Sequence, residues 1–426
     1  MSKTNKIFAL CKNIQPVYRS ILGKGNYKTL GLLKNINKKL KIISFNSNKK
    51  VFDWKIPKEW NLKNGFVEDI LTGNKVIDFK KNMLAVAGYS QPVDEIIKLK
   101  NLKKKIFTSN SQKDAYPYVN FFYQKDWAFT MPQKEKKKLN EKKYRVKINS
   151  KFKKGKLYAG ELIIKGRLKR EILLTSYICH PSMANNEISG PSVLTYIAKW
   201  LSNNRKRKYT YRILFLSETI GAISYIHKNI KSLKKNVIGG YVITCVGDER
   251  SYSYLKSKNE NSLSDKVALE EFSKIKKRKK IYSWLDRGSD ERQFNAPGVD
   301  LDIGSIMKSK YNTYKEYHTS NDDLNKVVTP KGLLDSFSLI KKIILRFEKK
   351  IIPISTVKCE PFLSKRNIYY RSIAGVAEKN NKDLWNFISF CDGKYFLEDI
   401  AKKVKITNSK AKKILKILHQ ARLVDY

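Results

Sequence analysis

Cysteine is scarce in this chain and follows no framework spacing. Its five cysteines are an odd number and include no C-x-x-C pair, which excludes a disulfide scaffold and a zinc ribbon and fits a reducing compartment. Long apolar runs are also missing: the N-terminal one is too short for a signal peptide, and none approaches the length of a transmembrane helix. We therefore expect a cytoplasmic protein without a membrane span.

Acidic residues are few beside basic ones: 38 Asp and Glu against 88 Lys and Arg give a formal net charge of +50. Such a charge first suggests nucleic acid or an anionic membrane as a partner. The lysines, however, are spread over the whole length, and Lys outnumbers Arg, whereas recognition of phosphates and bases favours Arg. Lys, Asn and Ile are abundant together, which is typical of an AT-rich genome. The composition therefore favours a solvated basic surface with weak, salt-sensitive adhesion to polyanions.

From residue 171 onward, short apolar runs alternate with helical patterns. Runs at 172–178, 209–216 and 237–246 predict buried strands, and the intervening helices predict a mostly parallel sheet covered on both faces. Residues 41–168 instead show β-branched and aromatic runs separated by turns, which is typical of an all-β module. We predict an α/β fold with an inserted β domain. The predicted division is 1–40 for N-terminal helices of the α/β domain, 41–168 for the inserted β domain, 169–352 for the α/β domain and 366–426 for a small C-terminal unit.

The C-terminal unit, 366–426, follows a linker that begins after Pro353. Three helical patterns and a final short strand are typical of a winged helix. Four lysines on its last predicted helix keep DNA binding open, although the same fold serves equally as a protein-contact module. They are Lys410, Lys412, Lys413 and Lys416.

Histidine is the rarest candidate ligand, with four in the chain. His227 and His419 fall inside predicted helices, whereas His180 and His318 fall in loops at strand ends of the α/β domain. Glu218 directly follows another strand, and ligands of open α/β sheets bind beyond the carboxyl ends of the strands. Two imidazoles, a carboxylate and an open position for water suit a catalytic zinc site. The spacing equally allows ordinary polar loop residues.

Five motifs carry a resemblance that covers nearly the whole chain. They are Val51–Trp54 with Pro57–Trp60, Cys179–Ser182, Glu218–Gly221, Gly288–Phe294 and Glu316–Ser320. With these motifs the α/β part resembles the zinc aminopeptidase clan. More closely, the chain is similar to a bacterial family of polysaccharide-biosynthesis proteins that combine an aminopeptidase-like domain, an inserted β domain and a C-terminal winged helix.

The resemblance implies roles for individual residues. His180 and His318 correspond to metal-binding histidines, and Glu218 corresponds to the general base that takes a proton from metal-bound water. The bridging Asp of the clan corresponds to Asn186 here. Because an Asn brings no negative charge, it binds zinc more weakly than an Asp.

Other departures from the clan concern the second metal ion. The clan's second Glu corresponds to Thr219, and a further metal-binding Asp corresponds to a position near Thr244. We therefore expect one zinc ion at most, held by His180, His318 and an oxygen of Asn186. Glu187 and Asp248 are nearby carboxylates that could replace a missing ligand.

These features favour a zinc-dependent hydrolase of an amide or peptide bond, linked through the family to surface polysaccharide biosynthesis. Asp290, Glu291 and Arg292 follow a Gly-Ser turn and are predicted to line the substrate pocket, where Asp290 could hold a free amine. The expected substrate is small, either peptide-like or an amino sugar.

Two alternatives stay open. The first is a binding or regulatory protein that keeps the aminopeptidase scaffold without turnover, which Asn186 and Thr219 favour. The second is a nucleic-acid binder that uses residues 366–426 and the basic charge. The sequence identifies neither the substrate nor the oligomeric state.

Overall fold

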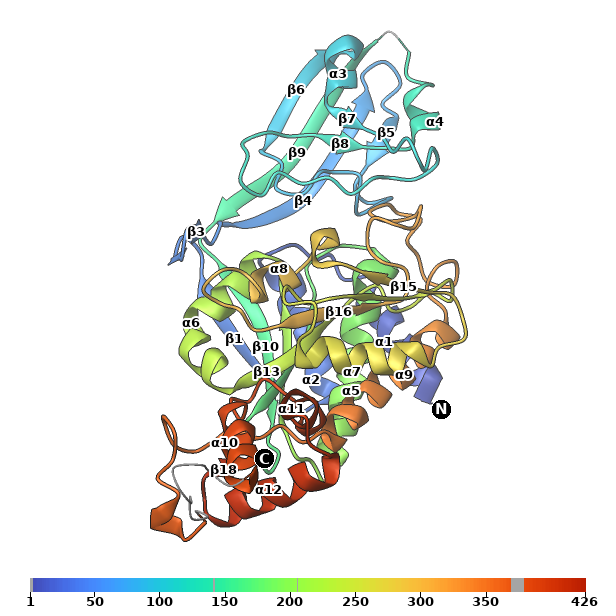
Figure 1. Ribbon diagram of the computed structural model, residues 1–426. Helices are drawn as coiled ribbons and strands as arrows, with labels where there is room; N and C mark the ends of the chain where they lie inside the picture. Colours follow the sequence, from blue (N-terminus) through green and yellow to red (C-terminus); the bar gives the residue numbers. More distant parts are fainter. Residues whose placement is uncertain (1–2, 141, 205, 369–378) are drawn as a thin grey trace.

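An eight-stranded sheet lies at the centre of the molecule (Figure 1). The computed structural model describes residues 3–140, 142–204, 206–368 and 379–426. In sheet order, the strands are β1 (Lys41–Asn46), β10 (Lys156–Ile164), β12 (Thr210–Leu216), β11 (Glu171–Tyr177), β13 (Val237–Ile243), β16 (Ile303–Met307), β14 (Tyr252–Leu255) and β15 (Lys279–Tyr282). From β12 to β16 neighbouring strands are parallel, which confirms the predicted α/β sheet.

Helices cover both faces of this sheet, because successive side chains of a buried strand point to opposite faces. In β11, Ile172 and Leu174 pack into one hydrophobic cluster, whereas Leu173 packs into the other. The second cluster includes α6 (Ile220–Asn236). The first includes α1 (Lys3–Ile14), α2 (Lys24–Ile36), α5 (Gly190–Asn203), α7 (Leu263–Ser273) and α9 (Pro330–Lys349).

The inserted β segment forms its own four-stranded antiparallel sheet, which projects from one end of the molecule in Figure 1. Its strands, in sheet order, are β5 (Lys75–Asp78), β4 (Glu59–Asp69), β9 (Lys143–Lys153) and β6 (Val93–Lys98). Strands β1 and β10 fall within the predicted range 41–168 but pair in the large sheet, so the inserted sheet is narrower than predicted. Their alternating pattern matches that of the inserted strands, so pattern alone cannot separate the two sheets.

The described part of the insertion also contains six smaller elements. They are β2 (Lys50–Val51), β3 (Trp54–Lys55), α3 (Leu99–Lys104), β7 (Ile106–Phe107), β8 (Phe129–Thr130) and α4 (Gln133–Lys136). Strands β2 and β3 form a hairpin that contacts α6.

The C-terminal unit packs around a separate hydrophobic cluster. It contains α10 (Lys379–Ser389), α11 (Leu397–Val404) and α12 (Asn408–Gln420), and β18 (Val424–Asp425) pairs with β17 (Ile354–Ser355). Part of the predicted range 366–426, namely 369–378, lies outside the described residues. On the face toward α7, Lys266 Nζ lies 2.6 Å from Asp399 Oδ2, which ties α11 to the α/β part.

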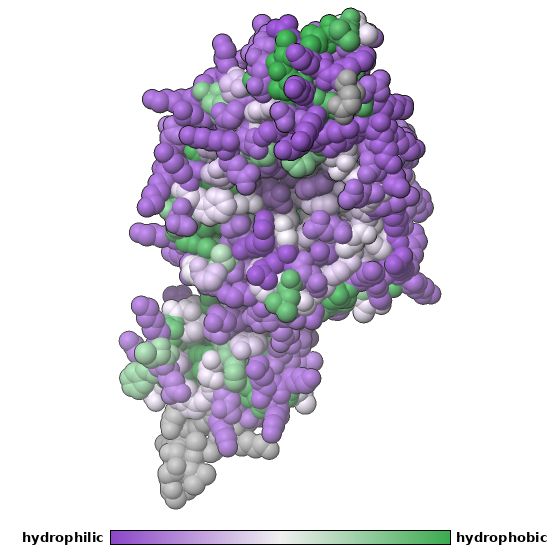
Figure 2. Space-filling model, turned by 90° about the horizontal axis from the view of Figure 1, so that it is seen from above, coloured by the Kyte–Doolittle hydropathy of each residue, from purple (hydrophilic) through white to green (hydrophobic). Residues whose placement is uncertain are grey.

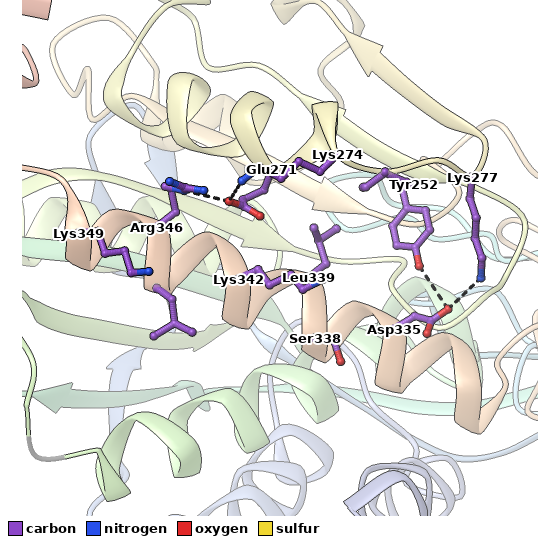
Figure 3. Close-up of a pocket in the computed structure, with 12 residues that line it drawn as sticks. Tyr252, Glu271, Lys274, Lys277, Asp335, Ser338, Leu339, Lys342, Arg346 and Lys349 are labelled. Atoms are coloured by element: carbon purple, nitrogen blue, oxygen red, sulfur yellow. Dashed lines mark hydrogen bonds and ion pairs between the residues drawn. The ribbon is translucent and has the colours of Figure 1, made fainter. Parts of the chain in front are cut away.

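The surface is mostly hydrophilic on the face that Figure 2 shows, as the composition predicts. Between α7 and α9 lies a groove of about 560 Å³ whose cationic lining residues are drawn in Figure 3. They are Lys274, Lys277, Lys342, Arg346 and Lys349. Within the described ranges, no helix is both long enough and apolar enough to cross a membrane.

Beside this groove lies a lysine that the fold almost completely buries. Lys308 follows β16 and is 1% exposed; its Nζ lies 3.5 Å from the centroid of the Tyr252 ring and 3.8 Å from Asp335 Oδ2. Burial lowers the pKa of Lys308 to about 8, and the nearby Asp335 carboxylate only partly opposes this effect. Between about pH 8 and the ordinary lysine pKa, the Lys308 side chain is therefore protonated more fully in the unfolded chain than in the folded chain.

The free energy of unfolding should therefore rise with pH from about pH 8 toward the ordinary lysine pKa. We expect Lys308→Met to remove about 1 to 3 kcal/mol of the rise between about pH 8 and 10, measured by urea unfolding. Lys342→Met, at an exposed position of the same groove, should leave the rise unchanged. If the free energy of unfolding of Lys308→Met rose with pH as much as that of the wild type, burial would not be lowering the pKa of the Lys308 ammonium.

Candidate metal centre

Three predicted site residues meet at the carboxyl edge of the large sheet. His180 lies in the loop after β11, Glu218 directly follows the loop end of β12, and His318 lies in the segment between β16 and α9. His180 Nε2 is 3.6 Å from Glu218 Oε2, and the ring centroids of His180 and His318 are 5.3 Å apart. Since a Zn–N bond is about 2.0 to 2.1 Å long, two rings at this separation can reach one ion.

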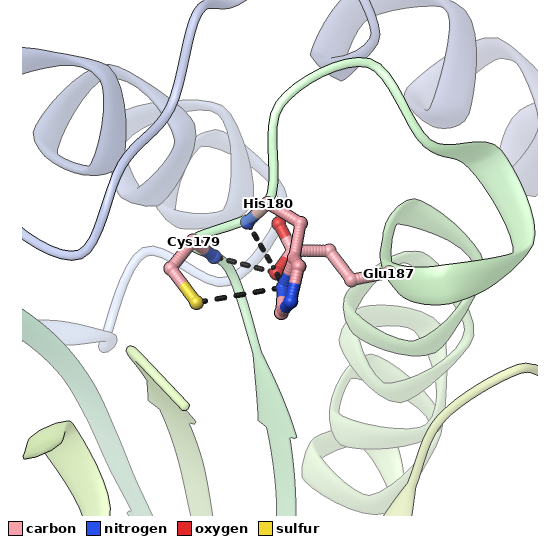
Figure 4. Close-up of side chains that lie close together, drawn as sticks. All are labelled: Cys179, His180 and Glu187. Atoms are coloured by element: carbon pink, nitrogen blue, oxygen red, sulfur yellow. Dashed lines mark hydrogen bonds and ion pairs between the residues drawn. The ribbon is translucent and has the colours of Figure 1, made fainter. Parts of the chain in front are cut away.

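Glu187 contacts the Nδ1 atom of the His180 ring, and Figure 4 draws both side chains together with Cys179. Its Oε2 lies 3.0 Å from His180 Nδ1 and accepts the backbone N–H groups of Cys179 (2.6 Å) and His180 (2.8 Å). Its Oε1 lies 3.1 Å from Arg19 Nε, and both side chains are buried. This carboxylate therefore faces Nδ1, whereas Nε2 faces Glu218.

Arg19 comes from the segment between α1 and α2 and is 1% exposed. Its guanidinium donates to Glu187 and to the carbonyl oxygens of Ile14 (2.9 Å), Val17 (3.0 Å) and His180 (2.6 Å). An arginine presents several donors in a rigid fork, so this single side chain can fix both the carboxylate and the loop backbone.

The two imidazoles differ in their electrostatics. Burial lowers the pKa of His180, but the hydrogen bond and charge of Glu187 outweigh burial and raise it overall. Burial, together with the nearby His180, holds the pKa of His318 well below its ordinary value, so the His318 ring is neutral. His318 Nε2 is buried and has no hydrogen-bond partner among the described residues. A neutral imidazole with an unpartnered buried nitrogen suits a metal ligand.

Cys179, His180 and Glu187 also place potential ligand atoms within 4.8 Å of one another. Burial, reinforced by the charge of Glu187, raises the pKa of the Cys179 thiol well above its ordinary value. Metals bind the deprotonated thiolate, which this raised pKa disfavours. The Glu187 carboxylate already accepts hydrogen bonds from Arg19 and from the Cys179 backbone N–H. This trio therefore fits a hydrogen-bonded support for His180 better than a separate metal site.

Asn186 is tied into a neutral network. Its Oδ1 accepts a 2.5 Å hydrogen bond from the Tyr177 hydroxyl, which in turn accepts one of 2.6 Å from Thr244 Oγ1. The resemblance to the zinc aminopeptidase clan predicts carboxylate ligands at the position of Asn186 and near Thr244. Because no charge remains on either side chain, a second cation would find little to bind here.

Asp290 and Glu218 lie close together at the start of α6. Thr219 N–H donates to Asp290 Oδ1 (2.7 Å), Asp290 Oδ2 is buried without a partner, and Ser289 Oγ donates to Glu218 Oε1 (2.7 Å). Burial raises the pKa of Glu218, and burial together with the charge of Glu218 raises the pKa of Asp290 well above its usual range. Two carboxyls whose pKa values are both raised are typical of a proton-transfer site.

The other two residues predicted to line the pocket, Glu291 and Arg292, lie on α8 (Glu291–Phe294); Glu291 is buried and Arg292 is exposed. Glu291 is buried and accepts hydrogen bonds from Gly288 N–H, Ser289 N–H and the Tyr311 hydroxyl (2.7 Å), so it shapes the turn. Arg292 is exposed, and its Nη2 lies 3.3 Å from Thr219 Oγ1. Arg292 therefore stands at the mouth of the site.

The remaining candidate, Asp248, is engaged away from the histidines. Its carboxylate accepts from Asn185 Nδ2 (3.0 Å) and from the backbone and hydroxyl of Ser309 (2.9 Å each). Asp322, which the sequence did not single out, accepts the backbone N–H groups of Asn185 (2.7 Å) and Asn186 (2.9 Å), and burial raises its pKa to about 6. Both acids thus organise the loop around Asn186.

Tyr118 brings the inserted segment into the site. Its ring centroid lies 5.1 Å from that of His180 and 5.2 Å from that of His318, and its N–H donates to the His318 carbonyl oxygen (2.8 Å). On the other side of His318, the Tyr317 ring stacks at 3.9 Å. The insertion thus forms one wall of the candidate centre.

Comparison with known proteins agrees with this architecture. The family "Domain of unknown function (DUF4910)" matches residues 8–350, and "winged helix-turn-helix" matches residues 352–426. A protein of Clostridium acetobutylicum, provisionally named as a polysaccharide biosynthesis protein with an aminopeptidase-like domain, is 39% identical over 401 residues, which cover 93% of this chain and 91% of that protein.

Solved structures show the same relationship. A crystal structure from Clostridium acetobutylicum, provisionally described as a peptidase, is 37% identical, covers 99% of this chain and 96% of its own, and has a TM-score of 0.78. A zinc aminopeptidase of Bacillus subtilis is 14% identical with a TM-score of 0.61, covers 81% of this chain and 95% of its own, and shows the fold alone. The chain therefore belongs to the DUF4910 family, with an aminopeptidase-like domain followed by a C-terminal winged helix.

Proposed function

We propose that this protein is a zinc-dependent hydrolase of an amide bond, with one ion held by His180 and His318. The observation that carries the proposal is the meeting of His180 Nε2, Glu218 and the unpartnered His318 Nε2 at one sheet edge. The residues fit a single ion, because they offer two imidazole nitrogens beside the Glu218 carboxylate but lack charge at Asn186 and Thr244. When bound, zinc would polarise the amide carbonyl and lower the pKa of a water molecule.

Glu218 is the proposed proton carrier of the reaction. Its carboxylate takes a proton from the attacking water and delivers it to the leaving amine. Burial raises the pKa of Glu218, which brings it toward the range in which one group can both accept and donate. Ser289 Oγ, which donates to Glu218 Oε1, orients the carboxylate, and the free Asp290 Oδ2 offers an acceptor to the amine of the substrate.

The test of this proposal is a hydrolysis assay on small amides that include aminoacyl amides and N-acetylated amino sugars. Zinc-loaded protein is expected to release amine from at least one class, and protein stripped with a chelator should not. Equal release with and without zinc would contradict the proposal.

Arg19 and Glu187 are proposed as the support of His180. The Glu187 carboxylate, hydrogen-bonded to Nδ1 of His180, fixes the orientation of the ring and makes Nε2 a better metal ligand. Loss of such a hydrogen-bond partner typically weakens metal binding by about 10- to 100-fold. We expect Arg19→Met and Glu187→Gln each to weaken zinc binding by about that factor. A chromophoric chelator competition measures the zinc affinity without any substrate.

Arg292→Met is the matched control, because this arginine is exposed at the site mouth and touches neither His180 nor Glu187. It should keep the zinc affinity of the wild type. If Arg19→Met also kept it while remaining folded, the guanidinium would be supporting only the loop.

The relatives' name links them to polysaccharide biosynthesis, and we extend this link to the present chain as part of the proposal. The neutral network at Asn186 favours a second candidate, a binding protein on the same scaffold without turnover. Absence of zinc from protein produced in zinc-supplemented cells, together with saccharide binding, would select that candidate.

Nucleic-acid binding by the C-terminal unit is a further proposal. Lys412, Lys413 and Lys416 are exposed on α12, while the acidic Asp399 of α11 faces the α/β part. Removal of residues 366–426 should reduce salt-dependent DNA binding if α12 provides it. Unchanged binding by the truncated chain would assign the adhesion to the overall charge.

A further inference from the structure

An apolar groove of about 350 Å³ lies between the β2–β3 hairpin and α6. Its floor includes Ile223 and Ile226, which are 5% and 1% exposed, and its wall includes Phe52 and Trp54, which are 48% and 39% exposed. The rest of its lining is Asp53, Ile230, Gln293, Ala296, Pro297, Gly298 and Val299. Exposed aromatic rings beside an apolar floor mark a binding surface more often than a packing defect.

The groove is unlike the rest of this surface in charge. None of its eleven lining residues is Lys or Arg, in a chain with 88 of them, and its one charged residue is Asp53. The groove between α7 and α9, by contrast, has five cationic lining residues. The nearest cation with a contact to the lining is Lys234, whose Nζ donates to the Gly298 carbonyl oxygen (2.9 Å) at the edge of the groove. A lining this poor in charge suits a neutral ligand better than a phosphate-bearing one.

Phe52, in the loop of the β2–β3 hairpin, has an unfavourable backbone conformation. Phe52 occupies a two-residue loop with a φ of 52°, a left-handed conformation that costs a bulky residue about 1 to 2 kcal/mol. Its ring contacts His227 edge-on at a centroid distance of 4.9 Å, and Trp54 contacts the exposed Tyr123 at 5.5 Å. Glycine or asparagine is the usual choice at such a turn, so the phenylalanine indicates a use for its side chain.

The groove and the candidate centre share two elements, α6 and α8, which meet where Arg292 Nη2 lies 3.3 Å from Thr219 Oγ1. Ile223 lies in the first turn of α6, which begins two residues after Glu218, and Gln293 lies on α8 immediately after Arg292. One turn of helix spans about 5.4 Å, so Ile223 lies about one turn along α6 from Thr219, a distance that a disaccharide is long enough to bridge.

We propose that this groove binds the sugar ring of a neutral N-acylated amino sugar, with the ring lying against Trp54 and Phe52. A pyranose offers an apolar C–H face to the aromatic wall and hydroxyl groups to Asp53 and Gln293, whose side chains make no hydrogen bond to other described residues. A purely hydrocarbon ligand would make no hydrogen bond to either group. The proposed ligand therefore combines a C–H face with hydroxyl groups.

The inference deepens the proposed function and rests on it for the position of the scissile bond. In that reaction the water oxygen bonds to the acyl carbon and the carbon–nitrogen bond breaks. Glu218 carries the proton of the water to the amine, so the products are a carboxylate and an amino sugar. The reaction needs no reactant other than water.

Binding is to be measured without turnover, on zinc-loaded Glu218→Gln protein and on metal-free wild-type protein. The sugar probe is N,N′-diacetylchitobiose and the apolar probe is N-acetyl-leucinamide, each followed by calorimetry. We expect the sugar to bind, Trp54→Ala to weaken it about tenfold, which corresponds to about 1.4 kcal/mol, and Trp54→Phe to retain most of the affinity. Gln293→Ala should weaken it as well.

Leu71→Ala is the control, because Leu71 is 79% exposed and lies in the turn between β4 and β5 of the inserted sheet. It should leave sugar binding unchanged. Absence of sugar binding, sugar binding that Trp54→Ala does not alter, or Trp54-dependent binding of N-acetyl-leucinamide alone would each overturn the inference. Trp54-dependent sugar binding without any hydrolysis by wild-type protein would uphold the groove and reject the proposed hydrolase.

Discussion

Glu218→Gln is expected to lower the rate of amide hydrolysis by about 10²- to 10⁴-fold, the usual contribution of a general acid–base group. Gln keeps the shape of the side chain and can still accept from Ser289 Oγ, but it cannot take a proton from water. His180 and His318 are untouched, so zinc content and melting temperature should stay near those of the wild type. Steady-state kinetics and elemental analysis on the same preparation measure both effects.

The matched control is Glu249→Gln, which makes the same chemical change in an exposed residue paired with Lys331. It should hydrolyse amides at the wild-type rate. Full activity in Glu218→Gln would remove this residue from the mechanism.

His318→Ala is expected to abolish stable zinc binding, with an affinity loss of at least about 100-fold, and to abolish hydrolysis with it. The ring is neutral because burial holds its pKa well below the ordinary value, and its Nε2 has no competing partner in the described part of the chain. Loss of this nitrogen leaves His180 as the one imidazole of the proposed centre, which is too few ligands for a tight site. Titration against a competing chelator gives the affinity.

His419→Ala on α12 is the control for the loss of an imidazole, because His419 is half exposed and bonds to Val424 in the C-terminal unit. Its zinc affinity should equal that of the wild type. A His318→Ala protein that kept zinc at wild-type affinity would place the ion elsewhere, with the Cys179, His180 and Glu187 trio as the next place to look.

The central residues of the site could be predicted from the sequence because two simple rules locate them. Apolar runs mark the buried strands, and parallel strands end at a common edge, so His180 and Glu218 after neighbouring strands must lie close together. His318 follows a strand that the pattern also identifies. The same rules identified the α/β sheet and the winged helix.

Other parts of the site depend on contacts that no local pattern records. Arg19 meets Glu187 across 168 positions of sequence, and Tyr118 reaches the histidines from the inserted segment. The sequence suggests Glu187 as a carboxylate that could replace a missing ligand, but only the structure shows that it faces Nδ1 of His180 and is paired with an arginine. The sequence indicates that Glu187 lies near His180, but it does not indicate which of the two imidazole nitrogens the carboxylate contacts.

The replacement of the clan's acidic ligands also needs the structure to be understood. Asn186 and Thr244 each looked like the loss of a ligand, whereas in the fold both bind the Tyr177 hydroxyl. The two changes therefore form one neutral hydrogen-bond chain and are linked through a third residue. This arrangement supports a site for a single ion.

The most direct test of the whole account is anomalous diffraction at the zinc absorption edge from crystals grown with zinc. One anomalous peak per chain, within bonding distance of His180 Nε2 and His318 Nε2, is the predicted result. Two peaks, no peak between these rings, or a single peak bound by Cys179 and Glu187 would contradict it.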